Sequence, residues 1–307
     1  MSALAFTLLA VALAGPVPAL LARAGWPMRA PRAAIVLWQS IALAAVLSAF
    51  SAGLALVIGL FAPDSTGLPS ADVGQQIAAR GWPVWLASIV VLVGTIAIGV
   101  RLALAAVKVA VGPRRRRAHH RMFVDLLGDS RRELYGVRVL DVNEPLAYCL
   151  PGMRGRVVLS RGTLAALSDP ELTAIIGHER AHLRARHDLV LEAFVAVHTA
   201  FPRFVRSGSA LSAVRLLVEL LADDAAVRAA GPTPLARALV TCACGPTPAG
   251  ALAAGGPSTV IRVRLLSGPP TSRAVALTPY CAAAAVLVIP TVAVVVPWLT
   301  ELHRLWP

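Results

Sequence analysis

The sequence predicts a mostly helical membrane protein, with four transmembrane helices and a small cytoplasmic α+β domain between the third and the fourth. Of the 307 residues, 57% are hydrophobic, whereas soluble domains are about 45–50% apolar. The excess lies in a few runs that are long enough to cross a bilayer. The formal net charge is +13, and the basic residues gather beside those runs. Together these observations favour membrane spans over an oversized soluble core.

Four apolar runs account for the excess. The predicted spans cover residues 3–22, 41–61, 84–107 and 274–298. In the first, Gly15 and Pro16 are expected to kink the helix. No basic residue precedes this run, so it is interpreted as a retained span and not as a signal peptide. Trp38 is expected at the membrane interface, and Arg101 is expected to reach toward the lipid headgroups.

The loops set the predicted orientation. Residues 23–32 carry three arginines and no acid, residues 63–80 carry two aspartates and one arginine, and four arginines follow the third span at 114–117. Positive residues favour the cytoplasmic side, so the N-terminus is predicted outside. The expected regions are an N-terminal membrane region (1–112), a cytoplasmic domain (113–273), the last span (274–298) and a short external tail (299–307).

This placement also accounts for the basic charge without direct nucleic-acid binding. The run 114–117 is assigned to anionic lipid, and Arg262, Arg264 and Arg273 to the positive flank of the last span. The alanine- and arginine-rich, lysine-poor composition indicates a G+C-rich bacterial genome, and the protein is predicted to lie in the bacterial plasma membrane. The four cysteines are irregularly spaced and are interpreted as reduced, free thiols; they are Cys149, Cys242, Cys244 and Cys281.

The chemistry lies in the segment from Leu167 to Phe201. Ser168 followed by Glu171 is a helix-start signature. The helix it opens contains His178-Glu179-Arg180-Ala181-His182, an HExxH motif. Residues four apart lie on one helical face, so both imidazoles can reach one Zn²⁺ ion. Glu179, next to the first ligand, is then placed to act as general base on a water molecule.

A catalytic zinc needs a third protein ligand, and two carboxylates compete for that role. Asp188 lies ten residues after His178, but no glycine precedes it at position 185. The helix is therefore expected to continue and to turn Asp188 away from the metal. Glu219 is favoured because, on an amphipathic helix, its immediate neighbours from Leu216 to Leu221 are apolar, and a carboxylate in that setting needs a partner. Asp223, one turn later, and Asp188 are candidate partners of the ligand histidines. His187 and His198 are assigned to the surface or to an interface.

The stretches HERAHLRARHD and ELLADDAA together resemble the BlaR/MecR-type integral-membrane zinc peptidases, the antirepressor branch of the gluzincins. The resemblance implies a cytoplasmic gluzincin domain between the third and fourth spans and a protein substrate, a winged-helix transcriptional repressor. It also implies that a strand near Arg156–Ser160 is an edge strand that pairs with extended substrate.

Receptors of this family that sense β-lactams carry an external penicillin-binding domain after the last span, and no such domain is expected here. The outer loop 63–80, or the spans, would have to receive any signal. Two alternatives stay open: a quality-control peptidase of the heat-shock gluzincin type, and a non-catalytic membrane sensor or scaffold. Whether the protein forms a homo-oligomer is also left open.

Overall fold

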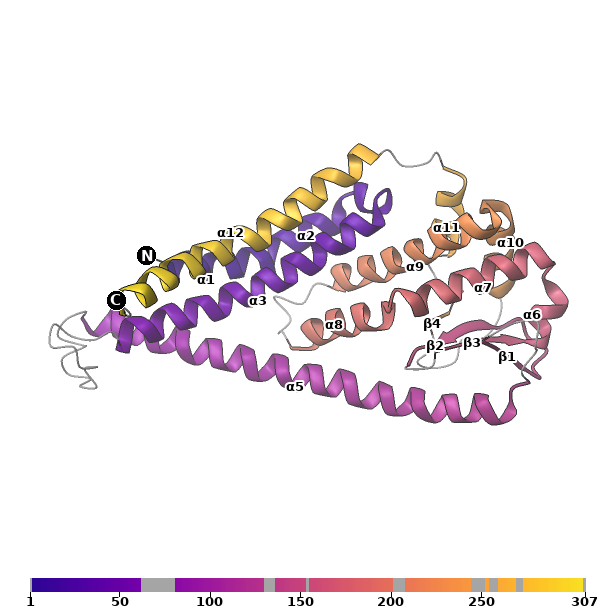
Figure 1. The fold of residues 1–307 in the computed structure, drawn as a ribbon, viewed down its shortest axis with the longest axis horizontal. Helices are drawn as coiled ribbons and strands as arrows, with labels where there is room; N and C mark the ends of the chain where they lie inside the picture. Colours follow the sequence, from indigo (N-terminus) through magenta and orange to yellow (C-terminus); the bar gives the residue numbers. More distant parts are fainter. Residues whose placement is uncertain are drawn as a thin grey trace.

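The computed structural model describes residues 2–61, 81–129, 136–152, 155–200, 208–243, 252–253, 259–268 and 273–305. Within these ranges the chain is mostly helical and contains one small mixed sheet, as the sequence predicts (Figure 1). The predicted outer loop 63–80 and Cys244 lie outside the described residues. The other three cysteines are free thiols.

The first apolar run forms two helices. α1 covers Ser2–Ala14 and α2 covers Pro16–Arg23. Pro16 occupies the first turn of α2, where its missing N–H costs no helical hydrogen bond, so the predicted break is confirmed. A short 3-10 helix, η1 (Trp26–Met28), leads into α3 (Pro31–Phe61). α3 thus begins ten residues before the predicted span.

The third apolar run belongs to a much longer helix. α5 covers Trp82–Leu127, 46 residues, and continues through Pro113 beyond the predicted end of the span at residue 107. One edge of the molecule is formed by this helix (Figure 1). Its far end lies against the sheet, where Val124 packs with Tyr148, Leu150 and Val158. α5 therefore belongs both to the membrane region and to the folded domain.

The fourth apolar helix, α12, covers Arg273–Leu305. The predicted tail 299–307 is therefore helical as far as Leu305. α12 and α1 both pack on α3, through a cluster that includes Leu13, Ile41 and Ala283. Among the described residues, three helical stretches are long and apolar enough to cross a membrane: Leu4–Arg23, Pro31–Gly53 and Trp82–Leu127. A fourth apolar stretch, Leu277–Val292, is shorter. The chain is a multi-pass membrane protein.

The sheet has four strands in the order β1-β3-β2-β4. β1 (Val137–Leu140) runs parallel to β3 (Arg156–Ser160), whereas β2 (Ala147–Leu150) is antiparallel to both β3 and β4 (Leu252–Ala253). A short helix, α6 (Arg161–Ala166), follows β3, and the Ser160 side chain caps it by accepting from the Thr163 amide. β3 has partners on both sides, so the prediction that it is an edge strand is wrong.

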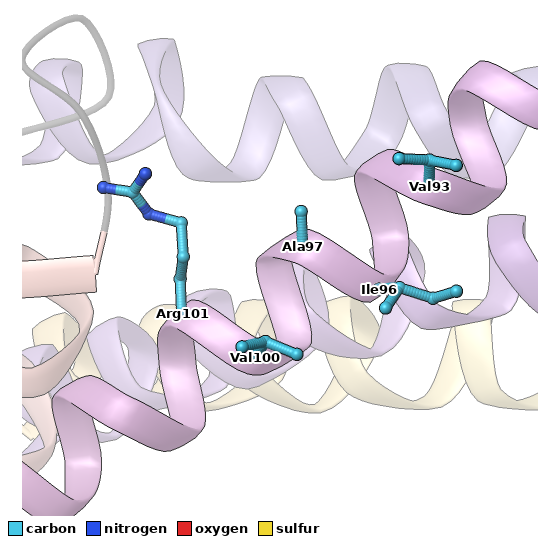
Figure 2. A pocket seen from close by; sticks show the side chains of 5 residues that line it. All are labelled: Val93, Ile96, Ala97, Val100 and Arg101. Carbon is cyan, nitrogen blue, oxygen red and sulfur yellow. The ribbon is translucent and has the colours of Figure 1, made fainter.

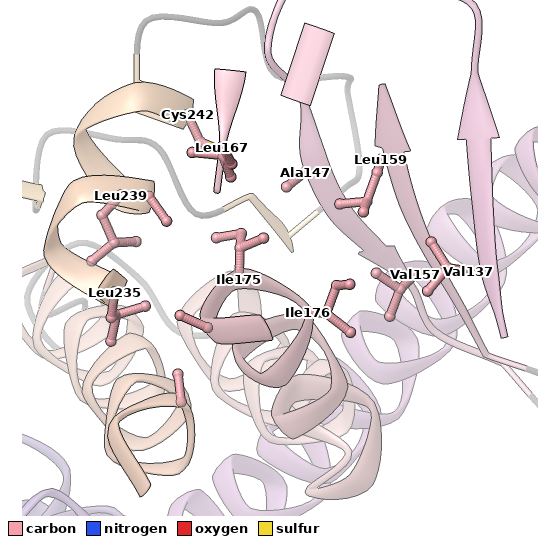
Figure 3. Close-up of a cluster of buried hydrophobic side chains, with 13 residues drawn as sticks. Val137, Ala147, Val157, Leu159, Leu167, Ile175, Ile176, Leu235, Leu239 and Cys242 are labelled. Carbon is pink, nitrogen blue, oxygen red and sulfur yellow. The ribbon is translucent and has the colours of Figure 1, made fainter. Parts of the chain in front are cut away.

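The core of the domain lies between this sheet and two helices. α7 (Asp169–Arg184) and α10 (Pro232–Ala243) cover one face, while the end of α5 covers the other. Figure 3 shows Ile175 and Ile176 of α7 between Leu235 and Leu239 of α10 and the strand residue Val157. Each fully buried aliphatic side chain of this kind contributes about 1.5–3 kcal/mol, which anchors α7 firmly on the sheet.

The domain is joined directly to the membrane helices. α8 (His187–Ala200) and α9 (Gly208–Ala230) lie between α5 and the α1–α3–α12 group (Figure 1). Trp38 and Ile35 of α3 pack against Leu217 and Val218 of α9. Trp38 is only 3% exposed, so the domain covers its indole ring; its position at the membrane interface stays a prediction.

A second connection is made by Arg101, which lies inside the apolar part of α5. Its Nε donates to the carbonyl oxygen of Ala200, 2.9 Å away, at the C-terminal end of α8. The guanidinium thus satisfies a helix-terminal carbonyl, whereas the sequence suggested that it reaches toward headgroups. Beside it, Val93, Ile96, Ala97 and Val100 line a hollow of about 410 Å³ (Figure 2). None of these lining residues belongs to the histidine–carboxylate cluster described next.

Candidate metal centre

The HExxH motif lies on α7, whose start is fixed by local hydrogen bonds. Ser168 and Glu171 form the predicted capping box, with the Ser168 amide donating to Glu171 Oε2 at 2.9 Å. On the same helix, His178 and Glu179 are fully buried and His182 is 2% exposed. A helix that is capped at its start and buried on the sheet holds these three side chains in a rigid frame.

The two motif histidines converge with Glu219 of α9, as the sequence predicts. The Nε2 atoms of His178 and His182 lie 3.1 Å apart. Glu219 Oε2 lies 3.5 Å from His178 Nε2, and its Oε1 lies 3.6 Å from His182 Nε2. One ligand atom from each of the three residues lies within 4.8 Å of the others. Two imidazoles and one carboxylate are a donor set typical of catalytic zinc.

Glu179 lies beside this cluster with no strong partner of its own. Neither carboxylate oxygen accepts a well-formed hydrogen bond from the described residues. Its polar neighbour is the thiol of Cys149, a weak donor. Burial raises the pKa of Glu179 to about 7. A buried carboxylate without a partner is costly, so its position calls for a polar group, such as a water molecule, that the protein itself does not supply.

Asp223 and Arg262 lie behind the histidines. His178 Nδ1 donates to Asp223 Oδ1 at 3.0 Å. Arg262 of α11 (Thr259–Leu266) donates from Nε to Asp223 Oδ2 at 2.8 Å and contacts Glu219 Oε2 through Nη1 at 3.0 Å. Burial alone would raise the pKa of Asp223, but the hydrogen bonds from Arg262 and His178 lower it to about 2. Asp223 therefore stays ionised and continues to accept from His178.

Arg262 was expected on the positive flank of the last span, and this prediction is wrong. Arg262 is 1% exposed and belongs to the cluster. A signal for this was present, because Val260, Ile261 and Val263 surround it in the sequence. An apolar setting for a charged residue indicates a buried partner, which is the argument that identified Glu219.

The charges of the cluster support a divalent ion. Glu179, Glu219 and Asp223 are three carboxylates, and Arg262 supplies a single positive charge. Buried charges need compensation. With Glu179 ionised and both histidines neutral as ligands, one Zn²⁺ would balance the remaining two negative charges, and the converging nitrogens would become its ligands. The residues present therefore fit a zinc ion.

His187, predicted to lie at the surface or at an interface, is buried and also belongs to this site. It is 3% exposed, and its Nδ1 lies 2.9 Å from His182 Nδ1. The helix does not continue past Ala185: α7 ends at Arg184, Arg186 adopts a left-handed conformation with φ 51°, and α8 begins at His187. A left-handed conformation costs a non-glycine residue about 1–2 kcal/mol. The other histidine assigned with it, His198, is partly buried near the end of α8.

Asp188 lies one residue further and points toward α5. It pairs with Arg117 at 3.7 Å and with Arg186 at 3.8 Å. Arg117 also pairs with Glu192 of α8 at 2.8 Å, and Arg114 pairs with the same carboxylate at 2.9 Å. The arginine run 114–117 is therefore divided: two members bind α8, whereas Arg115 and Arg116 are exposed. Its assignment to lipid alone is corrected.

Comparison with known proteins gives one match. The model of peptidase family M48 matches residues 113–269, just over half of the chain. This range contains the whole histidine–carboxylate cluster and begins in the middle of α5. No curated protein and no solved structure gives a significant match.

Proposed function

Because the chain belongs to peptidase family M48, we propose that this membrane zinc metallopeptidase faces the cytoplasm and cleaves a transcriptional repressor there. The zinc site is formed by His178, His182 and Glu219. The observation that carries the catalytic part of the proposal is Glu179: a buried, unpartnered carboxylate next to that site.

The proposed mechanism assigns one task to each group. When bound, the zinc ion polarises the scissile carbonyl and lowers the pKa of a water molecule. Glu179 accepts the proton of the attacking water and later donates it to the leaving amine. Burial raises the pKa of Glu179 and the charge of a bound zinc ion lowers it, so the carboxylate can both accept and donate a proton near neutral pH. Asp223 orients His178 through its Nδ1, and Arg262 keeps Asp223 ionised.

The cytoplasmic orientation is supported by the distribution of arginine. The short connection between the first two spans carries three arginines and no acid, and four arginines follow the third span. Both observations support a position of the domain on the positive, cytoplasmic side. The ion pairs of Arg114 and Arg117 leave Arg115 and Arg116 exposed beside the membrane helix, where they remain available for anionic headgroups.

The repressor is proposed from the resemblance to the BlaR/MecR-type peptidases. It is supported by the spacing of HERAHLRARHD and ELLADDAA and by apolar helices on both sides of the domain. The test compares purified wild-type protein with Glu179→Ala for bound zinc and for cleavage of repressor-like proteins from the same organism. We expect both proteins to bind about one zinc and only the wild type to cut one repressor. Cleavage by Glu179→Ala, or zinc bound by neither protein, would contradict the proposal.

A quality-control function is the second candidate, and one contact favours it. α9, which carries Glu219, packs through Leu217 and Val218 on Ile35 and Trp38 of α3. The active site is thus built directly on a membrane helix, close to where a damaged membrane protein would arrive. Cleavage of many unrelated membrane proteins, and not of one or two soluble ones, would select this function. The non-catalytic scaffold is not retained, because the chain belongs to a peptidase family and has its zinc site and Glu179.

A further inference from the structure

The zinc-site histidines make different contacts with their second ring nitrogens. Both rings direct Nε2 toward the metal position. The Nδ1 of His178 faces the Asp223 carboxylate at 3.0 Å. The Nδ1 of His182 faces the Nδ1 of His187 at 2.9 Å, with the two rings nearly perpendicular at 82°. Each ligand thus has its own partner, and only one of these partners is an acid.

Zinc binding at Nε2 of His182 determines which ring nitrogens of His182 and His187 carry a proton. An imidazole that binds zinc through Nε2 carries its proton on Nδ1 and needs an acceptor for it. At His182 that acceptor is the Nδ1 lone pair of His187, whose own proton is then on Nε2. Because a neutral imidazole accepts without carrying charge, His182 is oriented without a fourth carboxylate in a cluster that already holds three.

From this geometry we infer that His187 is a positioning residue of the zinc site: it accepts the hydrogen bond of His182 Nδ1 and so fixes that ligand's tautomer and ring orientation. The inference rests on the zinc site described above. The structure also holds His187 in place. Arg186 turns the chain between α7 and α8, and the next residue, Asp188, is paired with Arg117 of α5. The position of His187 is therefore fixed both by the turn at Arg186 and, through Asp188 and Arg117, by α5.

The test measures zinc affinity of the full-length protein by competition with a chelator of known affinity. His187→Phe and His187→Leu remove the acceptor and keep an apolar side chain, whereas His187→Asn places an amide oxygen close to the position of Nδ1. His119→Phe removes an exposed histidine of α5 and is the matched control. We expect His187→Phe and His187→Leu to raise the zinc Kd by about 10–100-fold. The zinc Kd of His187→Asn and of the control should stay close to that of the wild type.

Two results would overturn the inference. One is wild-type affinity in His187→Phe or His187→Leu; the other is an equal loss in His187→Asn, which would indicate that the ring only fills space. If both apolar variants fail to fold, the Kd of His187→Asn decides: a value close to wild type supports the inference and a raised value contradicts it. If the proposed zinc site itself were wrong, the wild type would not bind zinc, and this result is distinct from both of those above.

Discussion

Arg262 Nη1 lies 3.0 Å from Oε2 of Glu219, a zinc ligand, although the two residues come from different helices. The same guanidinium binds both oxygens of Asp223. One positive charge therefore links a zinc ligand to the carboxylate that orients another ligand. The cluster is a single electrostatic unit, in which removal of one member affects all the others.

The first prediction concerns this guanidinium. Arg262→Met leaves Glu219 and Asp223 without their shared cation, and breaking a buried ion pair costs about 3–5 kcal/mol. We expect the free energy of unfolding to fall by that amount in chelator and by less with zinc, since the ion supplies compensating charge. Arg262→Lys should lower the free energy of unfolding by less, because lysine keeps the positive charge although it loses the two-point contact with Asp223. Denaturant midpoints measure both effects; equal midpoints for Arg262→Met and wild type would contradict the pairing.

The second prediction concerns metal binding by α9. Glu219→Ala removes a ligand and should bind far less than one zinc per chain. Asp224→Ala removes the same charge from the same helix at an exposed position and should retain zinc. Metal analysis of the two purified variants after dialysis decides the matter. Similar zinc contents in both would mean that Glu219 is not the third ligand.

The third prediction is a pH dependence. Burial raises the pKa of Glu179 from 4.5 to about 7 in the metal-free site, and the positive charge of zinc lowers it again. Glu179 must be ionised to accept a proton. Activity is therefore present above the pKa that Glu179 has in the zinc-bound enzyme, and is lost as the pH falls through that pKa. We expect kcat/KM to decline about tenfold per pH unit on the acid side, with a midpoint between 4.5 and 7. A profile that stays flat down to pH 4.5 would rule out Glu179 as the base.

The fourth prediction concerns the junction of α5 and α8. Arg117 is 14% exposed and pairs with Asp188 and Glu192. Arg117→Ala should lower the free energy of unfolding by about 1 kcal/mol and weaken zinc binding, because His187 follows the movement of Asp188. The neighbouring Arg116 is exposed, so Arg116→Ala should change neither. Identical behaviour of the two variants would show that the ion pairs do not support the site.

The zinc ligands were predictable because their signals are local. Two histidines four residues apart on one capped helix need no tertiary information. Glu219 could be found because a charged residue among apolar neighbours must have a partner. Arg262 also has apolar immediate neighbours, Ile261 and Val263, but Arg264 follows two residues later, so the sequence favoured a positive flank of the last span.

The remaining features depend on tertiary contacts. Whether α7 continues past Ala185 depends on a left-handed Arg186, a conformation that residue propensities disfavour and that only the surrounding fold supports. The contact of His187 with His182 follows from that turn. The burial of Trp38 depends on α9 packing against α3. β3 lies inside the sheet because it pairs with β1 on the side that faces away from β2. In each case the hydropathy of the segment is compatible with either outcome.

The length of α5 has a mechanical consequence. At 1.5 Å per residue its 46 residues span about 69 Å, more than twice the thickness of the hydrocarbon layer, about 30 Å. A helix of that length, which loses one backbone hydrogen bond at Pro113, connects the membrane region to the sheet as a long arm. A change of about 5° in its tilt, of the size that a different bilayer thickness can impose, moves the opposite end by about 6 Å. The sheet packs on that end, so such a change in tilt would displace it by a distance comparable to the 4.8 Å within which the three ligand atoms lie.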